Sequence, residues 1–224
     1  MKETGDNYKI IDTFDALKNL ARTIDTEKTI GVDLEADSMY HFKEKVCLIQ
    51  MAAPGINVVI DPLMVRDLSP LKPIFKRRVV CKIFHGADYD VRSLYRDFDI
   101  TINNLFDTEL ASRFLGYSET GLEAVLKNKF DVALDKKFQR KDWSRRPLPL
   151  DMISYAAKDA RYLLPLAQIL TGELEELGYI VLQEKRKLEN PPPLLDHNGK
   201  VINPMADIST QPIFVQRHIL GERV

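Results

Sequence analysis

Three short strand patterns follow one another within residues 29–62 and narrow the range of folds open to this chain. TIGVDLE at 29–35 alternates apolar and polar residues, which is typical of a half-buried strand. VCLIQMA at 46–52 and NVVIDP at 57–62 indicate two more strands, and the link between them is short and rich in turn-forming residues. Successive strands with such short links favour an antiparallel meander.

Strand and helix patterns alternate after residue 62. We expect helices at 14–24, 68–76, 88–98, 107–116 and 121–130, and further strands at 79–84 and 102–106. A long helical pattern at 150–179 should bend at Pro165, because proline removes a backbone hydrogen-bond donor. Helices that follow an initial meander predict an α/β fold with a mixed sheet.

The length and composition fit one soluble domain with a tail. The chain has 224 residues, of which 45% are hydrophobic and 29% charged, values that are ordinary for a globular protein. Three successive prolines begin at residue 191. We therefore expect a domain at residues 1–188 and an irregular C-terminal arm or linker at 189–224.

The same composition argues against a membrane protein or a secreted one. No apolar run approaches 18 residues, and the N-terminus has no apolar signal core. Cys47 and Cys81 lie in apolar runs, so we expect buried thiols in a reducing compartment and a cytoplasmic location.

Carboxylates stand at positions where their ionised forms need a partner. Asp33 and Glu35 are two residues apart in a strand pattern, so both side chains point to one face; a solvated polar face is the commoner explanation of such a pair. Asp159 interrupts the apolar stripe of the 150–179 helix. A buried carboxylate there requires a salt bridge, a raised pKa or a metal ion. Tyr155 flanks Asp159 one turn earlier, where simple packing is its commonest role.

A third acidic group follows the predicted strand at 79–84. Asp88 and Asp90 both flank the apolar stripe of the helix expected at 88–98, and Asp88 is also a plausible N-cap. Helix geometry alone does not choose between them.

A basic segment, KKFQRKDWSRR at 136–146, contains six Lys or Arg residues against one acid. Positive charge interleaved with Phe138 and Trp143 suits a phosphate backbone and unstacked bases. A solvated loop with Trp143 as a core anchor is the alternative. The net charge of the chain is −1, so a nucleic-acid partner would need such a local cluster.

In this order, the motifs GVDLEAD, FHGADYDVRSLYRDF and SYAAKDARYLL resemble those of the ribonuclease D family, the DEDD 3′–5′ exonucleases whose last motif contains a tyrosine. The resemblance covers roughly residues 7–185 and is closest from QRKDWSRRPL onward. It implies a ribonuclease H-like fold, with a central mixed sheet of about five strands flanked by helices. It also selects Asp90 over Asp88. The catalytic residues that it implies are Asp33, Glu35, Asp90, Tyr155 and Asp159.

The resemblance further implies a two-metal hydrolase. Its ligands would be Asp33, Glu35, Asp90 and Asp159, whose hard oxygen atoms suit two divalent cations, Mg²⁺ or Mn²⁺. The metal ions would clamp the attacking and leaving oxygens and release nucleoside 5′-monophosphates from single-stranded 3′ ends. Tyr155 would orient the attacking water.

The implied substrate is nucleic acid, with RNA preferred over DNA because of the DWSRRPL segment. A DNA exonuclease of the same fold and a catalytically silent nucleic-acid-binding module remain the alternatives. Met51 is a candidate contact for the terminal base, although core packing explains it equally well. Arg140, Lys141 and Arg145 are candidate phosphate ligands. Ribonuclease D usually continues into helical HRDC domains, for which we expect no room before residue 224.

Overall fold

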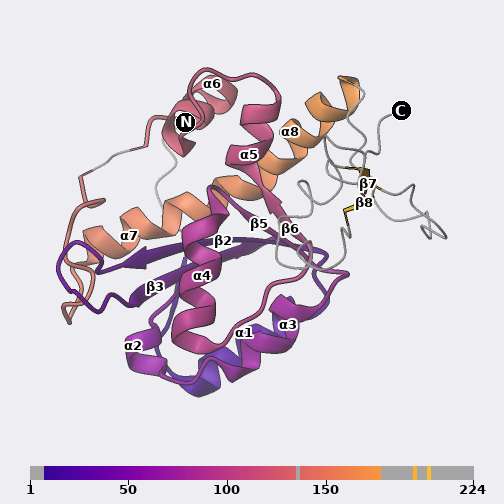
Figure 1. The fold of residues 1–224 in the computed structure, drawn as a ribbon. Coiled ribbons are helices and arrows are strands. Elements are labelled where there is room, and N and C mark those ends of the chain that lie inside the picture. The colour runs from indigo at the N-terminus through magenta and orange to yellow at the C-terminus, as the bar shows by residue number, and fades with distance from the viewer. Residues whose placement is uncertain (1–7, 135–136, 178–193, 196–200, 203–224) are drawn as a thin grey trace.

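A mixed six-stranded sheet forms the centre of the computed structural model, which describes residues 8–134, 137–177, 194–195 and 201–202 (Figure 1). Its strands are β1 (Lys9–Ile11), β2 (Thr29–Ala36), β3 (Val46–Ala53), β4 (Ile56–Ile60), β5 (Cys81–Phe84) and β6 (Leu105–Asp107). Their order across the sheet is β1-β4-β3-β2-β5-β6. The predicted meander of β2, β3 and β4 is antiparallel, whereas β5 runs parallel to β2 and β6 parallel to β5.

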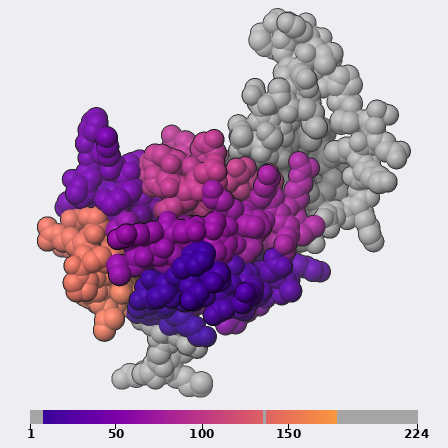
Figure 2. All heavy atoms as spheres, turned by 90° about the horizontal axis from the view of Figure 1, so that it is seen from below, coloured from indigo at the N-terminus to yellow at the C-terminus, as the bar shows by residue number. Residues whose placement is uncertain are grey.

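Helices cover both faces of the sheet (Figure 1). On one face lie α1 (Phe14–Ile24), α2 (Pro62–Val65), the 3₁₀ turn η1 (Ser69–Leu71), α3 (Lys72–Lys76) and α4 (Ala87–Phe98). On the other lie α5 (Thr108–Phe114), α6 (Leu122–Phe130), α7 (Leu150–Asp159), the 3₁₀ turn η2 (Ala160–Tyr162) and α8 (Leu163–Glu176). Viewed from the first face, the indigo residues of α1 and the magenta residues of α4 lie beside each other at the surface (Figure 2).

The two faces of β2 differ as its alternation predicts. Ile30 and Val32 are fully buried in the core beneath α1, α3 and α4. Asp33 and Glu35 point to the opposite face, toward α7 and η2. Since β2 lies between β3 and β5, this polar face is near the middle of the sheet.

The sheet has one strand more than the five expected. The additional strand is β1, whose three residues were not predicted to form a strand. It forms an edge of the sheet and pairs in parallel with β4, with Lys9 opposite Val58 and Ile11 opposite Ile60. This pairing joins segments about 50 residues apart, so the tertiary fold decides it.

The long C-terminal helical pattern is interrupted one turn before the predicted bend. α7 ends at Asp159, the 3₁₀ turn η2 follows, and α8 begins at Leu163. Pro165 therefore lies in the first turn of α8, where a missing N–H costs little. Its ring crowds the carbonyl four residues earlier, that of Arg161, and this crowding explains why the break falls in η2.

The C-terminal arm lies almost entirely outside the described residues. Only β7 (Leu194–Leu195) and β8 (Val201–Ile202) are described there, and they form an antiparallel pair. The predicted boundary at residue 188 also falls outside. Among the helices of the described ranges, none is long and apolar enough to cross a membrane.

Candidate active site

Three of the predicted carboxylates meet above the centre of the sheet. Asp33 and Glu35 lie on β2, and Asp159 is the last residue of α7. Each offers one oxygen atom, and these atoms all lie within 4.8 Å of one another. The side chains are half-buried. Carboxylate oxygens at such spacing can share a divalent cation.

A glycine makes this approach possible. Gly31 is on the same face of β2 as Asp33, and η2 lies directly over it. A Cβ atom at Gly31 would be 2.9 Å from the carbonyl oxygen of Ala160 and 2.9 Å from Cδ1 of Leu164. The missing side chain therefore lets the residue after Asp159 lie against β2.

Asp90 approaches the group from the other helical layer. It lies in the first turn of α4 with only 8% of its surface exposed. Its negative charge contributes to raising the pKa of Glu35, although Asp90 is outside the group of three that meets within 4.8 Å. Asp88 instead is exposed and pairs with Arg92 at 2.5 Å. Asp90 therefore lies near the acidic centre and Asp88 on the surface, a difference that helix geometry alone did not predict.

The cap of α4 is not Asp88, which corrects the sequence-based expectation. The helix begins after Gly86, whose φ is +71°. The buried Asp107, at the end of β6, accepts hydrogen bonds from the N–H groups of Gly86 at 2.9 Å and Ala87 at 2.8 Å. It also accepts from the N–H groups of Glu109 and Leu110 at the start of α5. One carboxylate therefore fixes the first turns of two helices, including the turn that holds Asp90.

Burial and mutual repulsion disfavour the ionised forms of these acids. Burial raises the pKa of Asp33 to about 7, although a backbone hydrogen bond from Leu34 opposes the change. Burial and then the charge of Asp33 raise the pKa of Asp159 to about 8. For the same two reasons the pKa values of Glu35 and Asp90 are well above their usual range. A bound cation would favour the ionised forms of all four.

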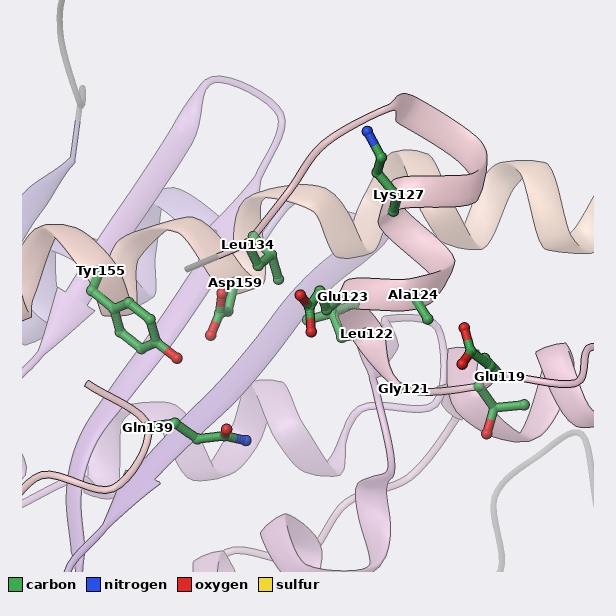
Figure 3. Close-up of a pocket in the computed structure, with 11 residues that line it drawn as sticks. Glu119, Gly121, Leu122, Glu123, Ala124, Lys127, Leu134, Gln139, Tyr155 and Asp159 are labelled. Atoms are coloured by element: carbon green, nitrogen blue, oxygen red, sulfur yellow. The ribbon is translucent and has the colours of Figure 1, made fainter. Parts of the chain in front are cut away.

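Tyr155 stands beside Asp159 at the wall of a cleft of about 620 Å³ (Figure 3). Its ring packs edge-on against Phe138, with centroids 5.6 Å apart, and lies 6.2 Å from the ring of Trp143. Trp143 is only 1% exposed. The aromatic residues of the basic segment therefore hold Tyr155 in place. The prediction that they stack on bases was wrong for Trp143, and its alternative role as a core anchor is confirmed.

The opposite wall of the cleft comes from the start of α6 and the turn before it. Its lining residues are Glu119, Thr120, Gly121, Leu122, Glu123, Ala124, Lys127 and Leu134, together with Gln139. Gln139 faces the cleft from the basic segment (Figure 3). Sequence reasoning did not single out Gln139, although it lies in the QRKDWSRRPL stretch that carries the closest resemblance.

The basic side chains of residues 137–146 divide into two kinds. Arg140, Lys141 and Arg145 are exposed, and Arg145 forms a surface ion pair with Asp142 at 3.0 Å. Arg146 is turned inward, where its guanidinium donates to both carboxylate oxygens of Asp61, at 2.6 and 2.8 Å, and to the carbonyl of Cys47. Such a two-pronged charged pair fixes the segment to the sheet.

A second loop is fastened to this basic segment. This loop is the connection of residues 37–45 between β2 and β3. Within it, the Tyr40 hydroxyl donates a hydrogen bond to the carbonyl of Arg140 at 2.8 Å. His41 Nε2 lies 3.2 Å from the hydroxyl of Ser144. Figure 2 shows the purple and the salmon segments side by side at one end of the molecule. The same loop exposes Met39 and Phe42, so apolar and basic side chains share this end.

Met51 does not reach the site, which corrects the proposed base contact. It is 2% exposed and packs in the core beneath α1. In the β2–β3 pairing Met51 is opposite Val32, on the face of the sheet away from Asp33. The alternative of core packing is the one the structure supports.

The two cysteines are free thiols. Cys47 is buried, and burial raises the pKa of its thiol to about 12. Cys81 is only half-buried, at the start of β5, so the expectation of full burial was wrong for this residue.

A mixed sheet between two helical layers, with carboxylates gathered over its central strand, defines a ribonuclease H-like domain with an acidic centre. A family model described as 3′-5′ exonuclease matches residues 8–175, and the chain belongs to that family.

Individual proteins agree with this assignment. The chain is 39% identical over 177 residues to Protein RRP6-like 3 of Arabidopsis thaliana, covering 79% of this chain and 20% of that protein. Among solved structures, the catalytic core of RRP6 from Trypanosoma brucei superposes with a TM-score of 0.74 at 35% identity, covering 77% of this chain and 48% of that one. Escherichia coli RNase D gives 0.74 at 32% identity, covering 78% and 47%. This chain spans about a fifth of the length of the curated relatives it matches.

Proposed function

We propose that this protein is a metal-dependent 3′–5′ exoribonuclease that removes nucleoside 5′-monophosphates from single-stranded 3′ ends. The observation that carries the proposal is the group of carboxylates on β2 and α7, whose oxygen atoms lie within 4.8 Å of one another. One of them, Asp159, lines a cleft together with Tyr155. Membership of the 3′-5′ exonuclease family supports the same reaction.

The donor set fits Mg²⁺ or Mn²⁺. Asp33, Glu35, Asp90 and Asp159 would hold two such ions, because all four supply hard oxygen atoms and none supplies sulfur or nitrogen. Burial and mutual repulsion raise the pKa values of these acids despite the Leu34 N–H beside Asp33 and the charge of Lys158 near Asp159, so a cation would relieve the cost of their ionised forms. When bound, the ions would make a water molecule nucleophilic at neutral pH and stabilise charge on the leaving 3′ oxygen.

The residues around this centre would position the substrate. The hydroxyl of Tyr155 points into the cleft beside Asp159 (Figure 3), where it can orient the attacking water by a hydrogen bond. The ring contacts with Phe138 and Trp143 restrict its rotation. A fixed donor at the reacting phosphate lowers the entropic cost of reaching the transition state.

The exposed Arg140, Lys141 and Arg145 would bind backbone phosphates upstream of the terminal nucleotide. They are on the segment that carries Phe138 and Trp143, next to the cleft. The preference for RNA is supported by the relatives, since Escherichia coli RNase D is described as an exoribonuclease involved in structured RNA processing. A single strand is favoured because a duplex end would first have to be unpaired.

Cleavage of matched substrates tests the proposal. Single strands of RNA and DNA with one sequence and a 5′ label should be incubated with Mg²⁺ or Mn²⁺, and with EDTA. We expect a ladder that shortens from the 3′ end, faster on RNA and absent with EDTA. Asp33→Asn should lower the rate by more than about 100-fold, since even residues that only support a metal ligand cost about 10–100-fold when removed.

The first turn of α4 offers a matched pair of variants. Asp90→Asn should lose activity like Asp33→Asn. Asp88→Asn removes an exposed acid that forms an ion pair with Arg92 on the surface of α4, and it should leave the activity unchanged. Absence of cleavage of both strands by the folded native protein would refute the enzyme and favour a silent binding module. Faster cleavage of DNA would instead establish the DNA exonuclease.

A further inference from the structure

The side chain of Gln50 is enclosed next to the acidic centre. Gln50 lies on β3, and in the antiparallel β2–β3 register it is directly opposite Asp33. Residues opposite each other in such a pair project to the same face, with Cβ atoms about 4.5–5.5 Å apart. The amide of Gln50 is therefore on the carboxylate face of the sheet, and its exposed fraction is 0%.

The surroundings of Gln50 on that face are mostly apolar. Leu48 and Ala52 flank it along β3 and are buried under the helices. The helical segment above the strand is α7 and η2, which bring the buried Ala156, Ala157 and Ala160 to the same layer. Three polar residues pair with β3 on this face: Asp33 is directly opposite Gln50, whereas Glu35 is opposite Leu48 and Asn57 is opposite Ala52.

Neither amide atom of Gln50 is satisfied. Within the described residues, Nε2 and Oε1 of Gln50 are both buried and both lack a hydrogen-bond partner. Burying an unpaired amide is unfavourable, and native proteins rarely tolerate it without a functional reason. An apolar side chain of the same length would fill this space at lower cost.

We propose that Gln50 is a positioning residue for Asp33: its amide N–H donates to the carboxylate of Asp33 when that carboxylate binds a divalent cation. This inference rests on the proposed function, because it needs the metal site. Carboxylates that bind metal ions are themselves commonly hydrogen-bonded by a neighbouring residue, which fixes the orientation of the ligand oxygen. An amide is suited to this position because it donates a hydrogen bond without adding another negative charge to the group.

If Gln50 positions Asp33, removing its amide should weaken metal binding without lowering the stability of the metal-free protein. Gln50→Met preserves the length of the side chain and removes the amide. In titration calorimetry without RNA, we expect this variant to bind Mn²⁺ about tenfold more weakly than the native protein. In EDTA its unfolding temperature should be equal or higher, because two unsatisfied buried atoms are gone.

Met51→Leu is the matched control, since it alters the next residue of β3 on the opposite face of the sheet. It should bind Mn²⁺ like the native protein. Native-like Mn²⁺ affinity in Gln50→Met would overturn the inference and leave the proposed function intact. Failure of the native protein to bind Mn²⁺ at all would overturn the metal site itself.

A structure of the native protein with Mn²⁺ provides a test that does not depend on the folding of a variant. We expect Nε2 of Gln50 within about 3.2 Å of a carboxylate oxygen of Asp33. An amide hydrogen-bonded to the backbone of η2 instead would show a structural role and overturn the inference.

Discussion

Replacing Gly31 with alanine would place a methyl group between β2 and the turn that follows Asp159. The new Cβ atom would lie 2.9 Å from the carbonyl oxygen of Ala160, 2.9 Å from Cδ1 of Leu164 and 3.2 Å from Cβ of Leu163. The Leu164 methyl group can rotate away, but the Ala160 carbonyl is backbone. Unstrained van der Waals contacts between heavy atoms begin at about 3.5 Å, so η2 must move away from β2 by roughly 0.6 Å.

This retreat should affect both stability and catalysis. Overpacking of a tight contact costs about 1–3 kcal/mol, and each kcal/mol lowers the unfolding temperature of a domain this size by about 2–4 °C. Asp159 is adjacent to η2 and should move away from Asp33 with it. A displacement approaching 1 Å at a reacting centre can cost about 100-fold in rate. Differential scanning calorimetry and single-turnover cleavage of labelled RNA measure the two effects separately.

Gly172→Ala is the matched control for this substitution. Gly172 lies in α8, and a Cβ atom there would meet no heavy atom within 4 Å. The control should stabilise the helix by up to about 1 kcal/mol and leave the cleavage rate unchanged. Native activity in Gly31→Ala would show that the close approach of η2 to β2 does not position Asp159, and would refute the reasoning.

Two further predictions concern pH and the anchor of the basic segment. In EDTA, the free energy of unfolding should fall as the pH rises from about 4 to about 8. In the folded state Asp33 and Asp159 keep their protons up to pKa values of about 7 and about 8, whereas in the unfolded chain both carboxyls ionise near 3.8. The unfolded state therefore releases protons that the folded state retains over this pH range. Unfolding temperatures measured with and without Mn²⁺ check this, and a flat profile in EDTA would contradict it. Arg146→Lys loses the two-pronged bond to Asp61 and should lower the free energy of unfolding in urea by about 1.5–3 kcal/mol. The exposed Arg145→Lys should not, and equal stability of both variants would count against the anchor.

Local periodicity predicted most elements of the fold. The helix at 14–24 coincides with α1 (Phe14–Ile24), and the apolar alternation of residues 29–35 correctly separated the two faces of β2. These predictions succeed because a helix or strand that buries one face must repeat its apolar residues with its own period. The short elements β1 and α2 were not predicted, whereas the equally short β5 and β6 lie within or overlap the strands predicted at 79–84 and 102–106.

The sequence predicted the acidic residues of the site, but it did not predict how all of them are arranged. The motif order identified Asp33, Glu35 and Asp159, which the fold brings within 4.8 Å. Asp88 and Asp90 were separable only by resemblance, because their difference depends on how α4 is set by Asp107 on β6.

The amino-acid sequence by itself determined five of the six strands of the central sheet, most helices, the family resemblance and the acids on which the chemistry depends. The tertiary structure decided which side chains meet. It placed Met51 in the core beneath α1 and Gln50 on the opposite face of the sheet, the face that carries Asp33. It also turned Trp143 inward to hold Tyr155. The physical reason is that a strand alternates its faces, so the role of each residue depends on which layer covers that face, and long-range packing assigns the layers.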